Sequence, residues 1–154
     1  MLLLLLACAS DVPDSAADPC EPWDSPELTL GTGEVAYEPL TESPLTLVYG
    51  PQGGQHVLIG LAGRGLTTDD ALDSELTGHI GGALAARSTP YVTFRCNASE
   101  GTQQAWNLFL VLVEGVTPQD VHDQDMDVHV TLTDTEGRTL EASATVHVYD
   151  PSQD

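Results

Sequence analysis

The chain has 154 residues, 41% of them apolar, and a formal net charge of −20 from 24 acidic residues against four basic ones. This length and apolar content suffice for one folded domain with its own core. So negative a surface repels phosphate groups and offers no polybasic patch. We therefore expect neither nucleic-acid binding nor charge-driven docking on anionic lipid.

The N-terminus has the features of an export leader. An apolar run at 2–6 ends in a small residue and a cysteine, which is typical of a signal peptide with its cleavage point. The motif LLAC at 5–8 resembles the lipobox of bacterial lipoproteins. That resemblance implies that residues 1–7 are removed and that Cys8 carries the lipid. Because the apolar run is short and no basic residue precedes it, we expect residues 1–7 to be the end of a longer leader. Ala9 after the cysteine implies the outer membrane.

A second segment, 8–26, is rich in proline and acidic residues and has few apolar ones. Such a composition does not build a core, so we predict an acidic tether between the lipid anchor and the domain. With Cys8 lipidated, Cys20 and Cys96 remain as a pair in an oxidising compartment. We therefore predict a disulfide between them; the alternative is two free thiols.

Residues 27–150 carry short apolar stretches separated by turn residues, which is typical of a sandwich or barrel. We predict an all-β fold, an immunoglobulin-like antiparallel β-sandwich of about seven to nine strands. The strands are expected at 27–31, 34–38, 45–49, 56–62, 72–80, 90–96, 106–113, 127–134 and 139–149. The segment 81–88 fits either a loop or a short helical turn. Trp106 is expected in the core, and 151–154 form a tail.

The last two strands form the hairpin with the best-defined register. Apolar and polar residues alternate along both, and the link at 135–137 fits a three-residue loop with glycine in the left-handed position. The resulting pairs are Asp134 with Arg138, Leu132 with Leu140, Val130 with Ala142 and Val128 with Ala144. The same register places His147 opposite Asp125, while about 13 Å separates His147 from His129, too far to share a metal ion.

Two longer segments resemble known exported proteins. VEGVTPQD at 113–120, followed after a strand by DTEGRT at 134–139, resembles the C-terminal part of extracellular immunoglobulin-like and fibronectin-like modules. EPWDSPELTLGTGEVAYEPL, followed by LVYGPQGGQHV, resembles uncharacterised envelope lipoproteins of the kind found in myxobacteria, over residues 27–57 of the domain. This second resemblance implies location in the cell envelope and brings no catalytic residues with it.

Four aspartates in the second half of the chain form the candidate metal site. Calcium is bound by six to eight oxygens, several of them from carboxylates in one loop. Asp123, Asp125 and Asp127 have the spacing that opens an EF-hand, but Val128 stands where that loop requires glycine. An EF-hand is therefore excluded. A calcium site at the sandwich edge, made by Asp120, Asp123, Asp125 and Asp127, stays as an alternative hypothesis.

The sequence contains no nucleophile elbow, phosphate-binding loop or zinc-protease motif, so we predict no catalytic residues and no cofactor other than this calcium. The expected function is that of a lipid-anchored, non-enzymatic cell-envelope domain, reaching the membrane through Cys8. Its expected partner is an envelope protein or polysaccharide. The alternative is a structural or adhesive calcium-binding module that uses the acidic segment 120–127.

Overall fold

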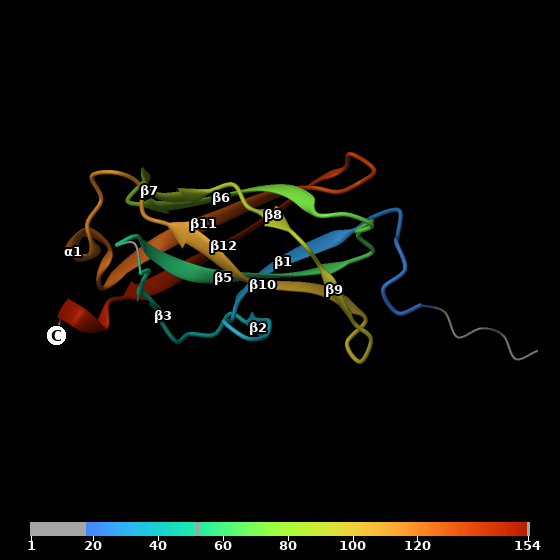
Figure 1. The fold of residues 1–154 in the computed structure, drawn as a ribbon, viewed down its shortest axis with the longest axis horizontal. Helices are drawn as coiled ribbons and strands as arrows, with labels where there is room; N and C mark the ends of the chain where they lie inside the picture. Colours follow the sequence, from blue (N-terminus) through green and yellow to red (C-terminus); the bar gives the residue numbers. More distant parts are fainter. Residues whose placement is uncertain (1–17, 52, 154) are drawn as a thin grey trace, which may run out of the picture.

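The computed structural model describes residues 18–51 and 53–153, which form two β-sheets packed face to face (Figure 1). The strands of the first sheet, in spatial order, are β2 (Glu38–Pro39), β1 (Glu27–Thr32), β5 (Gln55–Arg64), β10 (Thr102–Val111) and β9 (Arg95–Asn97), with β4 (Val48–Tyr49) also paired to β5. Those of the second are β3 (Leu45–Thr46), β12 (Thr139–Tyr149), β11 (Gln124–Thr133), β6 (Leu72–Ile80) and β7 (Ala83–Ser88), with β8 (Tyr91–Val92) also paired to β6. The predicted all-β sandwich is thus confirmed.

The strand order is that of an immunoglobulin-like sandwich. The run β1-β5-β10-β9 corresponds to the A-B-E-D sheet of such domains, and β12-β11-β6-β7 corresponds to the G-F-C sheet with one added strand. Strand β3 pairs with β12 in parallel, an exception to the predicted antiparallel pairing. The described chain has twelve strands instead of about seven to nine, mainly because two predicted strands are each divided.

Both divided strands cross from one sheet to the other. The segment predicted at 45–49 pairs with β12 through β3 and then with β5 through β4. The segment predicted at 90–96 pairs with β6 through β8 and then with β10 through β9. Each crossing closes one side of the sandwich. The division of these strands was not predicted, because an alternating sequence pattern does not indicate which sheet a strand joins.

Two local predictions differ from the structure. Residues 34–36, expected in a strand, form a bend after Gly33, whose φ is +128°, and this bend brings β2 back onto β1. The segment 81–88 is neither a loop nor a helical turn but holds strand β7. Gly81 and Gly82 both have positive φ, the conformation that a tight two-residue hairpin turn requires, and so pair β7 with β6.

The core lies between the sheets and is filled by alternate residues of each long strand. Strand β5 contributes Val57, Ile59 and Leu61, while β11 contributes Val128, Val130 and Leu132, all at most 1% exposed. The predicted hairpin register is confirmed pair by pair along β11 and β12. A one-residue slip would turn the apolar face of β11 outward, so burial specifies this register.

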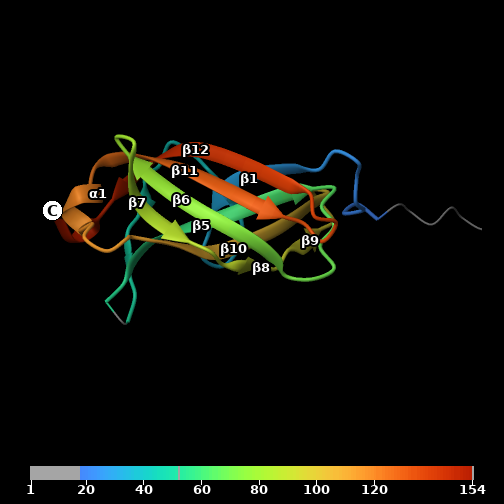
Figure 2. The same ribbon diagram turned by 90° about the horizontal axis from the view of Figure 1, so that it is seen from above.

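The two ends of the sandwich differ. The N-terminal segment leaves beside the β11–β12 hairpin loop, whereas helix α1 (Pro118–Val121) and the 3₁₀ turn η1 (Pro151–Gln153) lie at the opposite end (Figures 1 and 2). Neither of these short helical elements of the described chain has the length or the apolar character needed to cross a membrane.

Candidate functional site

A β-bulge in β10 shapes the outer face of the first sheet. Ala105 pairs with Leu61 and Leu108 with Ile59, so that Trp106 and Asn107 together oppose a single residue of β5. The backbone of Asn107 adopts the left-handed conformation, with φ of +59°. A bulge of this kind re-aims the side chains beside it and raises the local twist.

The bulge is fastened to the bend that follows β1. The backbone N–H of Asn107 donates to the carbonyl oxygen of Gly33, 3.0 Å away. On the same side of the sheet, the ring of Tyr37 covers Gly31 and Gly60, where any Cβ would collide with it or nearly so. Burial, and then the charge of Glu100, raises the pKa of Tyr37.

Trp106 does not belong to the core, contrary to the sequence prediction. It is half-buried on the outer side of the bulge, and the guanidinium of Arg95 lies over its ring, 5.3 Å from the ring centroid. The prediction was wrong because the dense apolar residues from 106 to 111 indicate burial but give no sign of the bulge, which places Trp106 on the outer face.

Arg95 is the one arginine in the described chain whose guanidinium has neither a hydrogen bond nor an ion pair. Its observed contact is with the Trp106 ring. The other three are engaged: Arg64 with the Glu100 carbonyl, Arg87 with Glu75, and Arg138 with Asp134. Arg64 also lacks a carboxylate partner, but within the described chain only Arg95 has none of its guanidinium N–H donors in a hydrogen bond.

Arg95 and Trp106 border an open cavity of about 350 Å³ on the outer face of the first sheet. Asn107 and Val35 complete its rim, and the Val35 side chain is 81% exposed. We call this cavity the tryptophan hollow; its lining residues are Val35, Thr93, Arg95, Ala105, Trp106 and Asn107. Its volume is in the range of small-molecule sites.

A second open cavity, of about 540 Å³, lies on the other side of the same bend and has a different chemistry. Its lining includes the carboxylates of Glu34 and Glu38 and the hydroxyls of Thr41, Ser43 and Thr46. We call it the hydroxyl hollow. The bend at 33–36 contributes to both cavities and so separates them.

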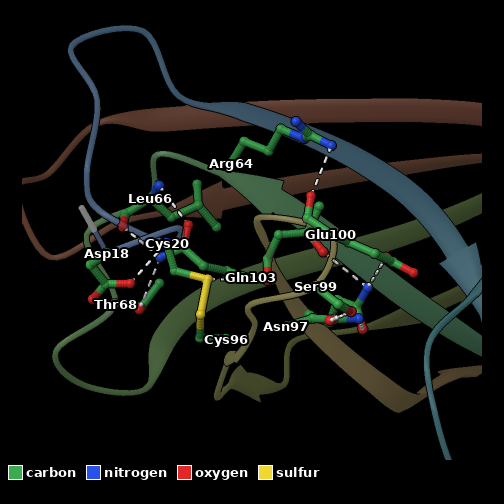
Figure 3. The surroundings of a disulfide bond; sticks show 12 residues. Asp18, Cys20, Arg64, Leu66, Thr68, Cys96, Asn97, Ser99, Glu100 and Gln103 are labelled. Carbon is green, nitrogen blue, oxygen red and sulfur yellow. Dashed lines mark hydrogen bonds between the residues drawn. A yellow bond between two sulfur atoms is a disulfide. The ribbon is translucent and has the colours of Figure 1, made fainter. Parts of the chain in front are cut away.

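The predicted disulfide between Cys20 and Cys96 is present, with 5.9 Å between the two Cα atoms (Figure 3). Nearby, the buried Gln103 side chain accepts from the backbone N–H of Leu66 and donates to its carbonyl, each at 2.8 Å. Asp18 lies close to both cysteine sulfurs, but sulfurs joined in a disulfide do not act as thiolate ligands for a metal.

The expected tether is attached to the domain over its described part. The backbone N–H of Trp23 donates to the carbonyl of Gly65 at 3.0 Å, and Arg138 donates to the carbonyl of Trp23 at 2.7 Å. Arg138 also pairs with buried Asp134 at 2.7 Å. Burial alone would raise the pKa of Asp134, but hydrogen bonds and the charge of Arg138 lower it.

The four aspartates of the predicted calcium site are divided among three partners, Thr117, His147 and Thr145. Asp120 accepts from the backbone and hydroxyl of Thr117 and caps helix α1, which lowers its pKa. Asp123 and Asp125 both contact His147, and Asp127 accepts from Thr145. Within the described residues the four carboxylates do not form a converged group, so calcium binding there stays a prediction.

One buried carboxylate has no counterpart in the sequence predictions. Asp150 is fully buried and accepts hydrogen bonds from Tyr49, Ser152 and Gln153. Its backbone N–H donates to His122, so this network joins β4, η1 and the segment after α1. Neither Asp150 nor Arg95 stands in a motif, and no spacing signal could have singled them out.

The sequence matches no known protein-family model and no curated protein. Because a sandwich fold by itself hosts many unrelated activities, function has to be inferred from the two hollows and the residues around them.

Proposed function

We propose that this protein is a lipid-anchored domain of the bacterial cell envelope that acts by binding and not by catalysis. Cys8 carries the lipid, and the outer face of the first sheet contacts an envelope polysaccharide or protein. The observation that carries the proposal is the β10 bulge, which holds Trp106 on the surface beside the unpaired guanidinium of Arg95.

The cysteine pairing supports the anchor. Of the three cysteines, Cys20 and Cys96 are joined to each other, which leaves Cys8 of the LLAC motif outside the intramolecular pair. A lipid chain contributes about 0.8 kcal/mol for each CH₂ buried in the bilayer, and two or more chains hold a protein stably.

The placement of the tether supports the choice of binding face. The end of the sandwich nearest the tether is occupied by the disulfide at Cys20 (Figure 3) and by Trp23, whose carbonyl accepts from Arg138 of the hairpin loop. A partner at that end would compete with the anchor segment for space, whereas the outer face of the first sheet points to the side.

Palmitate labelling in the producing bacterium tests the anchor. Label is expected on the wild type and not on Cys8→Ala, while Cys96→Ser is the matched cysteine control and keeps the label. A wild type without label would reject the lipid anchor.

Retention of radiolabelled envelope polysaccharide and protein on the immobilised full chain tests the binding face. Trp106→Ala is expected to lose the retained material. Tyr91→Ala removes a 75% exposed aromatic ring near the edge of the other sheet and is expected to keep it. Equal retention by both variants would reject this face as the contact.

A further inference from the structure

The guanidinium of Arg95 is held in one place without being neutralised. Stacking on the Trp106 ring restricts the side chain, and neither a hydrogen bond nor an ion pair uses its N–H donors within the described chain. A guanidinium presents five donors in a planar fork that matches the two oxygens of a carboxylate. The tryptophan hollow is therefore preorganised for a ligand that carries a carboxylate.

The rest of the hollow suits a compact polar ring beside that carboxylate. Trp106 offers an amphipathic aromatic surface, against which the C–H bonds of a sugar ring can pack. The Asn107 side chain, exposed on the rim, supplies a donor and an acceptor for hydroxyl groups. Together with Thr93, these groups form the mixed apolar and polar lining of a small-ligand site.

An extended peptide fits the same place less well. A peptide that adds to a sheet needs an uninterrupted row of backbone donors and acceptors along an edge. The ladder that joins β10 to β5 is interrupted between Ala105 and Leu108, and the Asn107 N–H donates to Gly33, so β10 is bent and more strongly twisted at this point. The bulge therefore disfavours the addition of a peptide strand to this part of the sheet.

The charge of the whole chain limits how many carboxylates the ligand carries. With a net charge of −20, a polymer with a carboxylate on every unit would be repelled along its length. Screening confines strong interactions between exposed charges to about 8 Å at physiological salt, so one carboxylate at Arg95 is attracted locally. The charge favours an acidic sugar flanked by neutral ones.

We propose that the tryptophan hollow binds a single uronic-acid unit of a largely neutral polysaccharide. The carboxylate pairs with Arg95, and the sugar ring packs against Trp106 within reach of Asn107. This assignment rests on the proposed binding function and names the substrate class of the same face.

Binding is measured by NMR on the full chain with a disaccharide of one uronic acid and one neutral sugar. The matched neutral probe is the same disaccharide with its carboxylate reduced to a primary alcohol. The protein carries two indole N–H signals, from Trp23 and Trp106. We expect the uronate to shift the Trp106 signal and leave that of Trp23 in place, and the neutral probe to bind at least about tenfold more weakly.

Arg95→Gln is expected to weaken uronate binding about tenfold or more, and Arg95→Lys to recover part of it, because lysine keeps the charge but lacks the fork. Arg87→Gln removes the same charge from the other sheet and is the control, expected to bind as the wild type does. Equal binding by Arg95→Gln and Arg87→Gln would overturn the assignment. So would equal affinity for both sugars, or a shift of Trp106 only with a dipeptide carrying a free carboxylate.

These outcomes are separable from the proposed function. If the wild type carries the palmitate label and retains envelope material, but the uronate leaves its Trp106 signal unshifted, the ligand class is rejected and the proposal of an anchored binding domain stands. Loss of palmitate label with an intact uronate response would reject the anchor and keep the site.

Discussion

Nδ1 of His147 lies 2.9 Å from Oδ1 of Asp125, directly across the pair formed by β11 and β12. Nε2 of the same ring lies 3.0 Å from Oδ1 of Asp123. A neutral imidazole has one N–H and can donate to only one carboxylate, whereas the imidazolium donates to both. These hydrogen bonds, to Asp125 first and then to Asp123, raise the pKa of His147 above its ordinary value of 6.5.

The first prediction concerns this histidine. Because its pKa is raised in the folded state, the contribution to stability is fully present below about pH 6.5 and is lost as the pH rises through the folded-state pKa. We expect NMR titration to give a His147 pKa above 6.5, lowered by Asp125→Asn. Asp127→Asn, which removes a carboxylate bonded to Thr145 instead, should change it much less.

The titration has to be followed at His147 itself, because another histidine acts in the opposite direction. His56 is stacked on Phe109 with 4.1 Å between ring centroids, and burial lowers its pKa. A melting temperature would combine the two effects. A His147 pKa at or below 6.5 would contradict the double hydrogen bond.

The second prediction concerns Asp150. Burial alone would raise its pKa, but hydrogen bonds from Tyr49, Ser152 and Gln153 outweigh burial and hold the pKa at about 2. Asp150→Asn should therefore lower the free energy of unfolding by about 2 kcal/mol at pH 7, by urea denaturation. Exposed Asp70→Asn is the control.

The sign of the pH dependence follows from the lowered pKa. The Asp150 contribution is present above the ordinary carboxyl value of 3.8 and is lost as the pH falls through about 2. The difference between wild type and Asp150→Asn should shrink at pH 3 and nearly vanish at pH 2. A difference that is the same at pH 7 and pH 2 would show that the mutation acts through packing alone.

The third prediction concerns the disulfide, which joins residues 76 positions apart. In the chain-entropy model, closing so long a loop destabilises the unfolded state by about 4 kcal/mol. We expect the double variant Cys20→Ser and Cys96→Ser to lose about that much in urea denaturation, and reduced wild type to match it. Cys8→Ser should leave the free energy of unfolding unchanged. An equal loss of unfolding free energy in the double variant, the reduced wild type and Cys8→Ser would contradict this pairing.

Much of the fold could be predicted because the long strands carry their own register. The alternation of Val128, Val130 and Leu132 against polar neighbours fixes which face of β11 is buried, and burial then fixes the pairing with β12. The disulfide was also predictable, since assigning Cys8 to the expected lipid anchor leaves Cys20 and Cys96 as one pair. These inferences depend on local patterns and counting, which a sequence displays directly.

The site was not predictable, because it depends on tertiary relations. The bulge at Trp106 arises where β10 pairs with β5 and where Asn107 bonds the distant Gly33. Likewise, nothing in the sequence tells that Arg87 finds a carboxylate and Arg95 does not. In the acidic segment, four aspartates that are close in sequence contact three different partners and do not converge on one point.

The fourth prediction compares two glycines of similar conformation. Gly65 has φ of +69° and Gly137 φ of +79°, so alanine at either position costs about 1 kcal/mol for the backbone. At Gly65, however, the new Cβ would lie 2.6 Å from Cβ of Trp23, whereas nothing is within 4 Å at Gly137. Gly65→Ala should therefore cost at least about twice as much in urea denaturation as Gly137→Ala. Equal losses would argue against the Trp23 contact.

The fifth prediction concerns calcium. Each of Asp120, Asp123, Asp125 and Asp127 already bonds a protein partner, and binding an ion would require several of those bonds to break. We expect calcium at millimolar concentration, or a chelator, to leave the melting temperature unchanged. A calcium-dependent rise that Asp125→Asn abolishes would establish the predicted site and reject this expectation.

Under the proposed lipid anchor, the attachment of Cys20 to the sandwich also limits how far from the bilayer the domain can work. With Cys8 as the anchor, the connecting chain is 9–19 and not 9–26. At 3.3–3.6 Å for each residue, the shorter chain reaches at most about 40 Å, against about 60 Å for the longer one. The proposed anchor would therefore let the domain bind the part of a polymer that lies within this distance of the bilayer, whereas a ligand fixed farther out would have to extend inward.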